Sequence, residues 1–194
     1  VVAPPRAGAR TLPVELVKAL LLAGASADFT FRNKKDILKY TFGRAGTAAN
    51  GLDKRYGMGM LNVAASEQIL TSEDSMTGFD YVSGIDDTAT RKTGRYALSP
   101  LHDGRLTVSL VWLLQLHATK SGELEAHLVN YDLCIVETGE QDTVIAESVG
   151  ADDTTENLRI DLQAGHHYEL RLMSPAADSH SWPYALAWRY QRSE

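Results

Sequence analysis

Short apolar runs separated by turn residues dominate the second half of the chain. Four of them follow one another, at Leu128–Glu137, Thr143–Val149, Leu158–Leu162 and Tyr168–Met173. Strands spaced roughly every 8–12 residues with Gly and Asp turns are typical of antiparallel sandwiches and barrels. In the last two runs apolar and polar residues alternate. That alternation predicts strands with one buried face and one solvated face.

Four further runs extend the set, at Tyr81–Gly84, Arg95–Leu98, Arg105–His117 and Tyr184–Tyr190. The long run Arg105–His117 carries apolar residues on both faces, with Val111 and Leu113 on the second one. This pattern predicts a central strand covered on both sides. About eight strands after residue 76 suit a jelly roll. The sequence therefore predicts a mainly β protein, an antiparallel jelly-roll β-sandwich preceded by a short α-helical segment.

The first part of the chain has helical patterns instead. Pro13–Ala25 is apolar almost all round, as expected of a buried helix, and Thr11 is the predicted cap. A second short helix is predicted at Val63–Leu70, with Asn62 as its N-cap. Between them, residues 28–56 give a mixed pattern, with a strand or helical turn at Asp36–Phe42.

Residues 71–78 are small and polar, which marks a candidate boundary. The predicted domains are residues 1–75 and residues 76–194. The chain has 194 residues, 44% hydrophobic and 23% charged, as expected of a globular protein. A net charge of −6 without a basic cluster argues against nucleic acid and against an anionic membrane surface as partners. No apolar run is long enough to span a membrane.

Residues 13–70 resemble the last part of a subtilisin-like serine peptidase domain. The stretch PVELVKALLLAGAS is similar to the helix that follows the nucleophile-bearing helix in that family. The segment Tyr56-Gly57-Met58-Gly59-Met60-Leu61-Asn62-Val63 resembles the family segment that leads into the final helix. The resemblance implies that the peptidase catalytic domain of the parent chain is a partner of these residues.

Residues 76–190 resemble the β-sandwich appended to many secreted bacterial subtilases, akin to pre-peptidase C-terminal domains and P domains. The resemblance rests on the order of short segments such as Asn130-Tyr131-Asp132-Leu133 and Ala164-Gly165-His166-His167-Tyr168. It implies a non-catalytic C-terminal segment of a secreted or cell-surface endopeptidase. The sandwich would serve stability, secretion or substrate contact. The alternatives are an independent carbohydrate-binding β-sandwich and a small enzyme whose site the sequence does not show.

The catalytic segments of the family are absent from these residues. The nucleophile segment Gly-Thr-Ser-x-(Ala/Ser)-x-Pro does not occur, and neither do the Asp and His segments. Ser75-Met76 lacks the preceding Gly-Thr and the following Pro. No catalytic residue is therefore assigned, and no peptidase turnover is expected from residues 1–194.

Acidic side chains offer a candidate calcium site. Calcium prefers carboxylate oxygens on loops. The predicted ligands are Asp132, Asp152, Asp153 and Glu156. Accessory domains of the family that the chain resembles sometimes bind calcium, whereas an ordinary solvated acidic turn is the alternative. His166 and His167 are adjacent in the sequence, so their side chains should point to opposite faces and not share a metal.

Two other motifs have structural explanations. Gly57 and Gly59 lack the third glycine and the preceding strand of a phosphate-binding fingerprint, so they should support the start of a helix. Trp112 and Trp188 lie in strand alternation and should be core, and Trp182 is the one candidate for an exposed sugar-stacking residue.

Finally, the apolar helix Pro13–Ala25 lacks its catalytic-domain neighbours. Self-association through residues 13–70 is therefore predicted in preference to docking on the sandwich.

Overall fold

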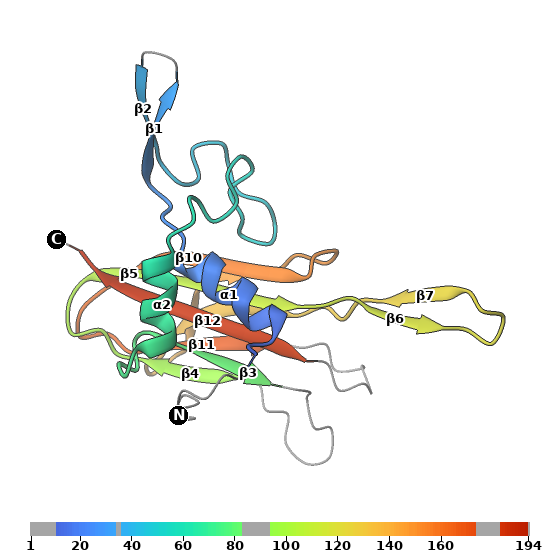
Figure 1. The fold of residues 1–194 in the computed structure, drawn as a ribbon. Coiled ribbons are helices and arrows are strands. Elements are labelled where there is room, and N and C mark those ends of the chain that lie inside the picture. Colours follow the sequence, from blue (N-terminus) through green and yellow to red (C-terminus); the bar gives the residue numbers. More distant parts are fainter. Residues whose placement is uncertain (1–10, 34–35, 83–93, 174–182, 194) are drawn as a thin grey trace.

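The computed structural model describes residues 11–33, 36–82, 94–173 and 183–193 (Figure 1). Two short helices and twelve strands lie in this part of the chain. Their bounds are α1 Val14–Gly24, β1 Phe29–Asn33, β2 Asp36–Tyr40, α2 Val63–Thr71, β3 Gly78–Val82, β4 Arg95–Leu98, β5 Gly104–Trp112, β6 Gln115–Ala118, β7 Leu124–His127, β8 Asp132–Glu137, β9 Thr143–Ser148, β10 Thr155–Leu162, β11 Tyr168–Met173 and β12 Tyr184–Arg192.

Two four-stranded sheets form the body of the molecule. One has the strand order β10-β5-β12-β3 and the other β4-β11-β8-β9. Four antiparallel pairs, β3 with β12, β4 with β11, β5 with β10 and β8 with β9, join the first half of the strands to the second in reverse order. This is a long two-stranded ribbon folded over on itself, which is the connectivity of a jelly roll. The predicted mainly β, antiparallel jelly-roll sandwich with a short helical segment is confirmed.

The inner faces of the sheets follow the alternation seen in the sequence. Tyr168, Leu170 and Leu172 on β11 are all 5% exposed or less. On β10, Leu158 and Leu162 are buried and Ile160 is partly buried against the same cluster. Both sheets contribute to this cluster, so hydrophobic burial between them holds the sandwich together.

The predicted strand Arg105–His117 is in fact broken. β5 ends at Trp112, and after Leu113 and Leu114 the chain enters β6, which pairs only with β7. The β6–β7 hairpin extends away from the sandwich (Figure 1). Val111 is fully buried on the outer face, as predicted, but Leu113 is 42% exposed, because it lies beyond the end of the sheet.

The helix α1 lies across the outer face of the sheet β10-β5-β12-β3, beside α2 (Figure 1). Its buried residues pack against Ile69 of α2 and against the sheet, forming one cluster of Leu16, Ala19, Leu20, Ala23, Ile69, Val111, Ala185 and Ala187. Docking on the sandwich was expected to be disfavoured, and this was wrong. The small residues Ala185 and Ala187 on β12 let α1 pack closely against this face of the sheet. Self-association through residues 13–70 stays a prediction.

The two helices differ in how their N-termini are capped. The N-cap position of α1 is Pro13, without a side-chain hydrogen bond, so the predicted cap at Thr11 was wrong. Asn62 caps α2 as predicted, because its Oδ1 accepts a hydrogen bond from the Ala65 N–H at 3.1 Å. The Asn62 side chain also donates to Ser26 Oγ at 3.1 Å, and this bond ties the end of α1 to the start of α2.

Gly59 fits tightly against the end of α1. Its φ is +114°, and a Cβ at this position would lie 2.2 Å from the Ser26 carbonyl oxygen. Ser26 and Met60 exchange two backbone hydrogen bonds, at 2.8 and 2.9 Å, beside it. The predicted structural role of the glycine is confirmed, since only glycine tolerates both the close approach and the backbone conformation.

None of the described helices is long and apolar enough to cross a membrane. The boundary predicted between residues 75 and 76 stays a prediction. Residues on both sides of it, such as Leu20 and Val111, share the cluster beneath α1.

Candidate functional site

A cavity of about 420 Å³ opens between the β1–β2 hairpin and the loop of residues 43–56. Its lining consists of aromatic, aliphatic and cationic side chains, namely Phe31, Leu38, Lys39, Tyr40, Arg44, Ala45, Arg55 and Tyr56. The hairpin projects from the sandwich, and the loop folds against its base (Figure 1). We refer to this feature as the hairpin pocket.

The buried carboxylate of Asp53 organises the hairpin pocket. It accepts hydrogen bonds from the Tyr40 hydroxyl at 2.7 and 2.9 Å, and from the backbone N–H groups of Gly43 (2.8 Å), Arg55 (2.8 Å) and Tyr56 (3.0 Å). Burial alone would raise the pKa of Asp53, but the bonds from Tyr40 and the backbone outweigh it and lower the pKa. The carboxylate is therefore an internal anchor whose charge is satisfied by the fold.

Aromatic rings line the hairpin pocket, and edge-to-face contacts support them. The Tyr40 and Tyr56 rings meet edge to face, with centroids 4.5 Å apart and an interplanar angle of 77°. Phe29 packs against Tyr56 at 5.2 Å, also edge to face. Because these rings hold one another in place, the wall is formed before any ligand arrives.

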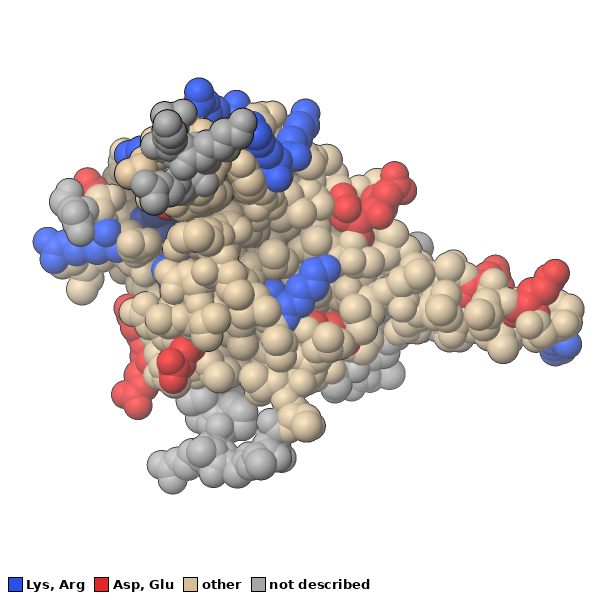
Figure 2. Space-filling view, turned by 45° about the horizontal axis from the view of Figure 1, so that its top comes forward, with Lys and Arg blue, Asp and Glu red and all other residues tan. Residues whose placement is uncertain are grey.

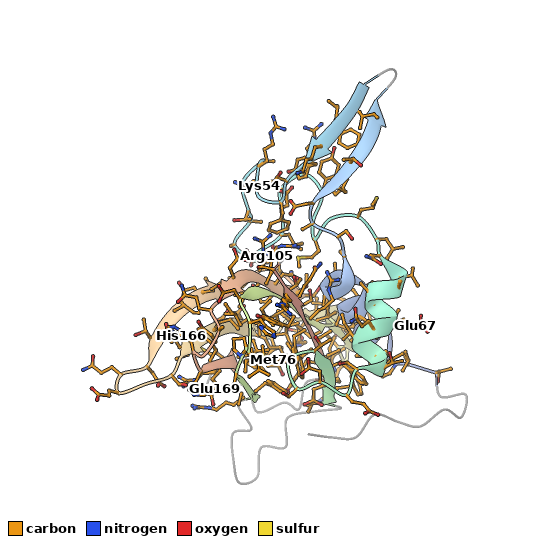
Figure 3. The ribbon with its side chains drawn as sticks, turned by 90° about the vertical axis from the view of Figure 1, so that its left-hand side faces the viewer. Lys54, Glu67, Met76, Arg105, His166 and Glu169 are labelled. Atoms are coloured by element: carbon orange, nitrogen blue, oxygen red, sulfur yellow. The ribbon has the colours of Figure 1, made fainter. Side chains whose placement is uncertain are left out.

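Positive charge surrounds the hairpin pocket. Lys39, Arg44, Lys54 and Arg55 are exposed, and none of them has an ion pair with another described residue. Figure 2 shows Lys and Arg side chains around the hairpin end, whereas Asp and Glu side chains lie along the β6–β7 arm. Lys54 lies on the loop above the sandwich (Figure 3). Cations beside aromatic faces favour a ligand that combines negative charge with an apolar group.

The sequence did not reveal the hairpin pocket. Its residues come from the mixed stretch 28–56, in which neither period two nor period 3.6 is sustained. The one signal was the alternation of aromatic and basic residues between Phe29 and Tyr56. These residues meet because β1 and β2 pair and Asp53 draws the following loop back to Tyr40.

The predicted calcium ligands occupy different environments. Glu156 on β10 is fully buried, and its two oxygens accept hydrogen bonds from Ser148 Oγ and from the Gly150 N–H, the latter at 2.7 Å. Asp132 is partly buried on β8, Asp153 is partly buried in the turn before β10, and Asp152 is exposed beside it. In this turn, Asp153 is therefore partly shielded from solvent, whereas Asp152 faces solvent.

Three of these four acids interact. Burial raises the pKa of Glu156 to about 7, with added contributions from the negative charges of Asp132 and Asp153. Asp152 is not among the causes of that shift. Within the described part of the chain, no three His, Cys, Asp or Glu side chains are grouped so as to hold a metal ion. Calcium binding stays a prediction, and the observed role of Glu156 is that of a buried, hydrogen-bonded acid.

One Ser–His contact is present on the surface. Ser99 Oγ lies 2.9 Å from His167 Nδ1, and both residues are exposed. No described carboxylate forms an ion pair with the His167 ring. His166 instead contacts Glu137, so the two histidines have different partners. Nucleophilic catalysis requires a base that is itself oriented and donors for an oxyanion, and the contact shows neither.

The tryptophans do not form a sugar platform among the described residues. Trp112 is fully buried and Trp188 is 8% exposed, so the prediction that both are core is confirmed. Trp182 lies outside the described residues.

No protein-family model matches the chain, and no curated protein matches it. Among solved structures, the chain is similar to the pre-peptidase C-terminal domain of a collagenase from Bacillus anthracis, with 12% identity and a TM-score of 0.41. That match covers 59% of this chain and 90% of the collagenase domain. A Sulfurospirillum deleyianum protein matches with 9% identity and a TM-score of 0.30, covering 57% of this chain and 96% of the other. A C-terminal domain of a collagenase is thus among the structures to which this chain is similar.

Proposed function

We propose that this chain is the non-catalytic C-terminal segment of a secreted subtilisin-like serine endopeptidase. In this proposal its β-sandwich supports the end of the peptidase domain. The observation that carries the proposal is the packing of α1 and α2 on the outer sheet face. Both helices belong to the residues that resemble the end of a peptidase domain, and Leu20 and Ile69 share one cluster with Val111 of the sandwich.

The motif residues support the same conclusion. In the segment Tyr56–Val63, Gly59 and Asn62 both contact Ser26, at the end of α1. The segment Tyr56–Val63 therefore connects α1 and α2 through Ser26 and holds them in the arrangement in which they pack on the sheet. The sandwich would pack against the end of a peptidase domain that terminated in α1 and α2, which fits a stabilising role.

The hairpin pocket suggests a second role, contact with substrate. The β1–β2 hairpin that carries it projects from the sandwich, and its exposed cations form no ion pair with a described residue. In the proposed parent, an extended acidic peptide with an apolar side chain fits both the charge and the aromatic wall. Trp112 and Trp188 are buried, so neither supports the alternative of an independent carbohydrate-binding module.

The proposal is tested first by the coding sequence upstream of Val1. It should contain a Gly-Thr-Ser-x-(Ala/Ser)-x-Pro segment, preceded by the Asp and His segments of a subtilisin-like peptidase. An upstream region without them would contradict the proposal. A glycan array on residues 1–194 tests the alternative, which specific sugar binding would establish.

The lack of catalysis is tested with a serine-reactive fluorophosphonate. We expect residues 1–194 to remain unlabelled, because the Ser99–His167 contact has no orienting carboxylate among the described residues. Ser99→Ala is the informative variant and the equally exposed Ser121→Ala is its control. Labelling that is lost only in Ser99→Ala would show that the chain carries its own nucleophile.

A further inference from the structure

Unpartnered buried polar atoms gather at one place on the outer face of the sheet β10-β5-β12-β3. Seven buried side-chain atoms in the described structure have no hydrogen-bond partner. Five of them belong to four neighbouring residues, and these atoms are Ser109 Oγ, Asn157 Oδ1, Arg159 Nε, Arg159 Nη1 and Arg189 Nε. A buried donor without a partner costs about 1–3 kcal/mol, and more when it is charged. Five at one place require an explanation.

Strand register explains why these residues meet. Thr107 on β5 is paired with Arg159 of β10 on one side and with Arg189 of β12 on the other. One pair further along, Ser109 is flanked by Asn157 and Ala187. Residues two apart on a strand share a face, and Val111, two residues beyond Ser109, packs beneath α1. The four residues therefore form a polar patch next to the helix, which we call the arginine patch.

Segments from the first part of the chain cover the arginine patch. Arg159 lies over the Phe42 ring, with its guanidinium carbon 5.4 Å from the ring centroid. Arg189 Nη2 donates to the Ala25 carbonyl at 3.4 Å, and Asn157 Nδ2 donates to the Asn50 carbonyl at 3.1 Å. The patch is thus enclosed between the sheet and the residues that follow α1. Arg105, at its edge, lies between the sandwich and the loop above it (Figure 3).

The charges at the arginine patch do not balance. Arg105 is held by Asp161 at 2.6 and 3.0 Å and lies 3.8 Å from Asp28. Arg159 and Arg189 have no ion pair with a described carboxylate. Three guanidinium groups therefore face two carboxylates. Burial, together with the charges of Arg105 and Arg189, lowers the pKa of Arg159 to about 10, so it is still cationic at neutral pH.

We propose that the arginine patch is a binding site for one small oxyanion, held by Arg159, Arg189 and Ser109. The free donors are the Nε–H and Nη1–H of Arg159, the Nε–H of Arg189 and the Ser109 hydroxyl. Guanidinium groups bind carboxylate and phosphate oxygens through such paired N–H donors. One anion would remove the excess positive charge and satisfy donors that the fold leaves open. This site lies on the sheet face and does not depend on the proposed peptidase parent.

The site is tested by titrating residues 1–194 with sodium phosphate and with sodium acetate in a calorimeter, at constant ionic strength set by sodium chloride. We expect saturable binding of one anion, weakened at least about tenfold in Arg159→Gln and Arg189→Gln, which corresponds to the loss of a charge-assisted contact. Arg192→Gln, an exposed cation near the end of the same strand, is the matched control and should bind as the wild type does. Tighter phosphate binding identifies a phosphoryl ligand, and tighter acetate binding a carboxylate.

A second measurement does not depend on detecting heat. In chloride buffer, Arg189→Met removes a partly buried charge that has no ion pair with a described carboxylate, and the variant should melt no lower than the wild type. In phosphate the wild type should gain melting temperature and the variant should not. Wild-type and variant proteins that respond equally to phosphate would overturn the proposal. So would an Arg189→Met protein that melts lower by the same amount in both buffers, since the arginine would then be structural.

Discussion

The buried acid Glu156 should make the stability of this protein fall as the pH rises from about 4.5 to about 7. The perturbation that isolates this effect is Glu156→Gln. The amide keeps the shape and polarity of the side chain but does not titrate. Because Glu156 is fully buried between Ser148 and Gly150, the exchange is close to isosteric in the folded state.

The magnitude follows from the two pKa values. Burial raises the pKa of Glu156 from its ordinary value of 4.5 to about 7 in the folded chain. Between these values the folded state keeps a proton that the unfolded state has lost, so stability decreases as pH rises. Each pKa unit corresponds to about 1.4 kcal/mol, so the total loss is roughly 3 kcal/mol. Below pH 4.5 both states are protonated, and above pH 7 both are ionised, so the stability difference is constant there.

The assay is urea unfolding of the wild type and Glu156→Gln at half-unit steps from pH 4 to pH 8.5. The difference between their free energies of unfolding cancels the titration of groups that do not interact with Glu156, which leaves Glu156 and its neighbours Asp132 and Asp153. We expect the wild type to lose roughly 3 kcal/mol relative to the variant across this range. Glu147→Gln, which removes an exposed carboxyl on the neighbouring strand β9, is the control and should parallel the wild type. A difference that stays constant within about 0.5 kcal/mol would refute the reasoning, because Glu156 would then titrate as it does in the unfolded chain.

Three further outcomes can be measured. Leu20→Ala should lower the free energy of unfolding by about 2–5 kcal/mol, because Leu20 is 5% exposed on the buried face of α1. The chain should sediment as a monomer in which the Leu20 amide exchanges slowly. A dimer that becomes monomeric in residues 76–194 alone would instead support self-association. Asn62→Ala should cost about 1 kcal/mol in chemical unfolding, since it removes the cap of α2, and an unchanged midpoint would contradict that. Millimolar calcium should raise Tm if it binds the folded state alone, Asp153→Ala should abolish the rise, and an unchanged Tm would disprove the calcium prediction.

The alternation of apolar and polar residues predicted most of the sandwich. Runs such as Tyr168–Met173 carry their own period of two, and this local signal survives in the fold because the strand buries one face. The number of strands and the reversal of their pairing then suit a jelly roll. The cap at Asn62 was predicted for the same reason, since it depends on the Ala65 N–H three residues away. A structural role for Gly59 was also predicted, but its tight contact with Ser26 joins residues far apart in the sequence and follows only from the fold.

The sites depend on contacts that a local pattern does not contain. The hairpin pocket forms because Asp53 binds Tyr40, 13 residues away. The acidic residues were predicted as a calcium site on loops, and that stays a prediction. Whether Glu156 points inward or outward is set by the register of β10 on β5, and this register buries it completely.

The sequence by itself determined where both helices and most strands of the sandwich form, because each residue's preference for water or core repeats with the geometry of its own element. Only the tertiary structure decided what covers the outer sheet face. Ala185 and Ala187 pack against α1 there. Arg159 and Arg189, which flank Thr107 in the sheet, lie beside the helix. The two arginines are 30 positions apart in the chain numbering. The two guanidinium groups come close enough to repel each other only once β10 and β12 have paired with the same central strand, β5.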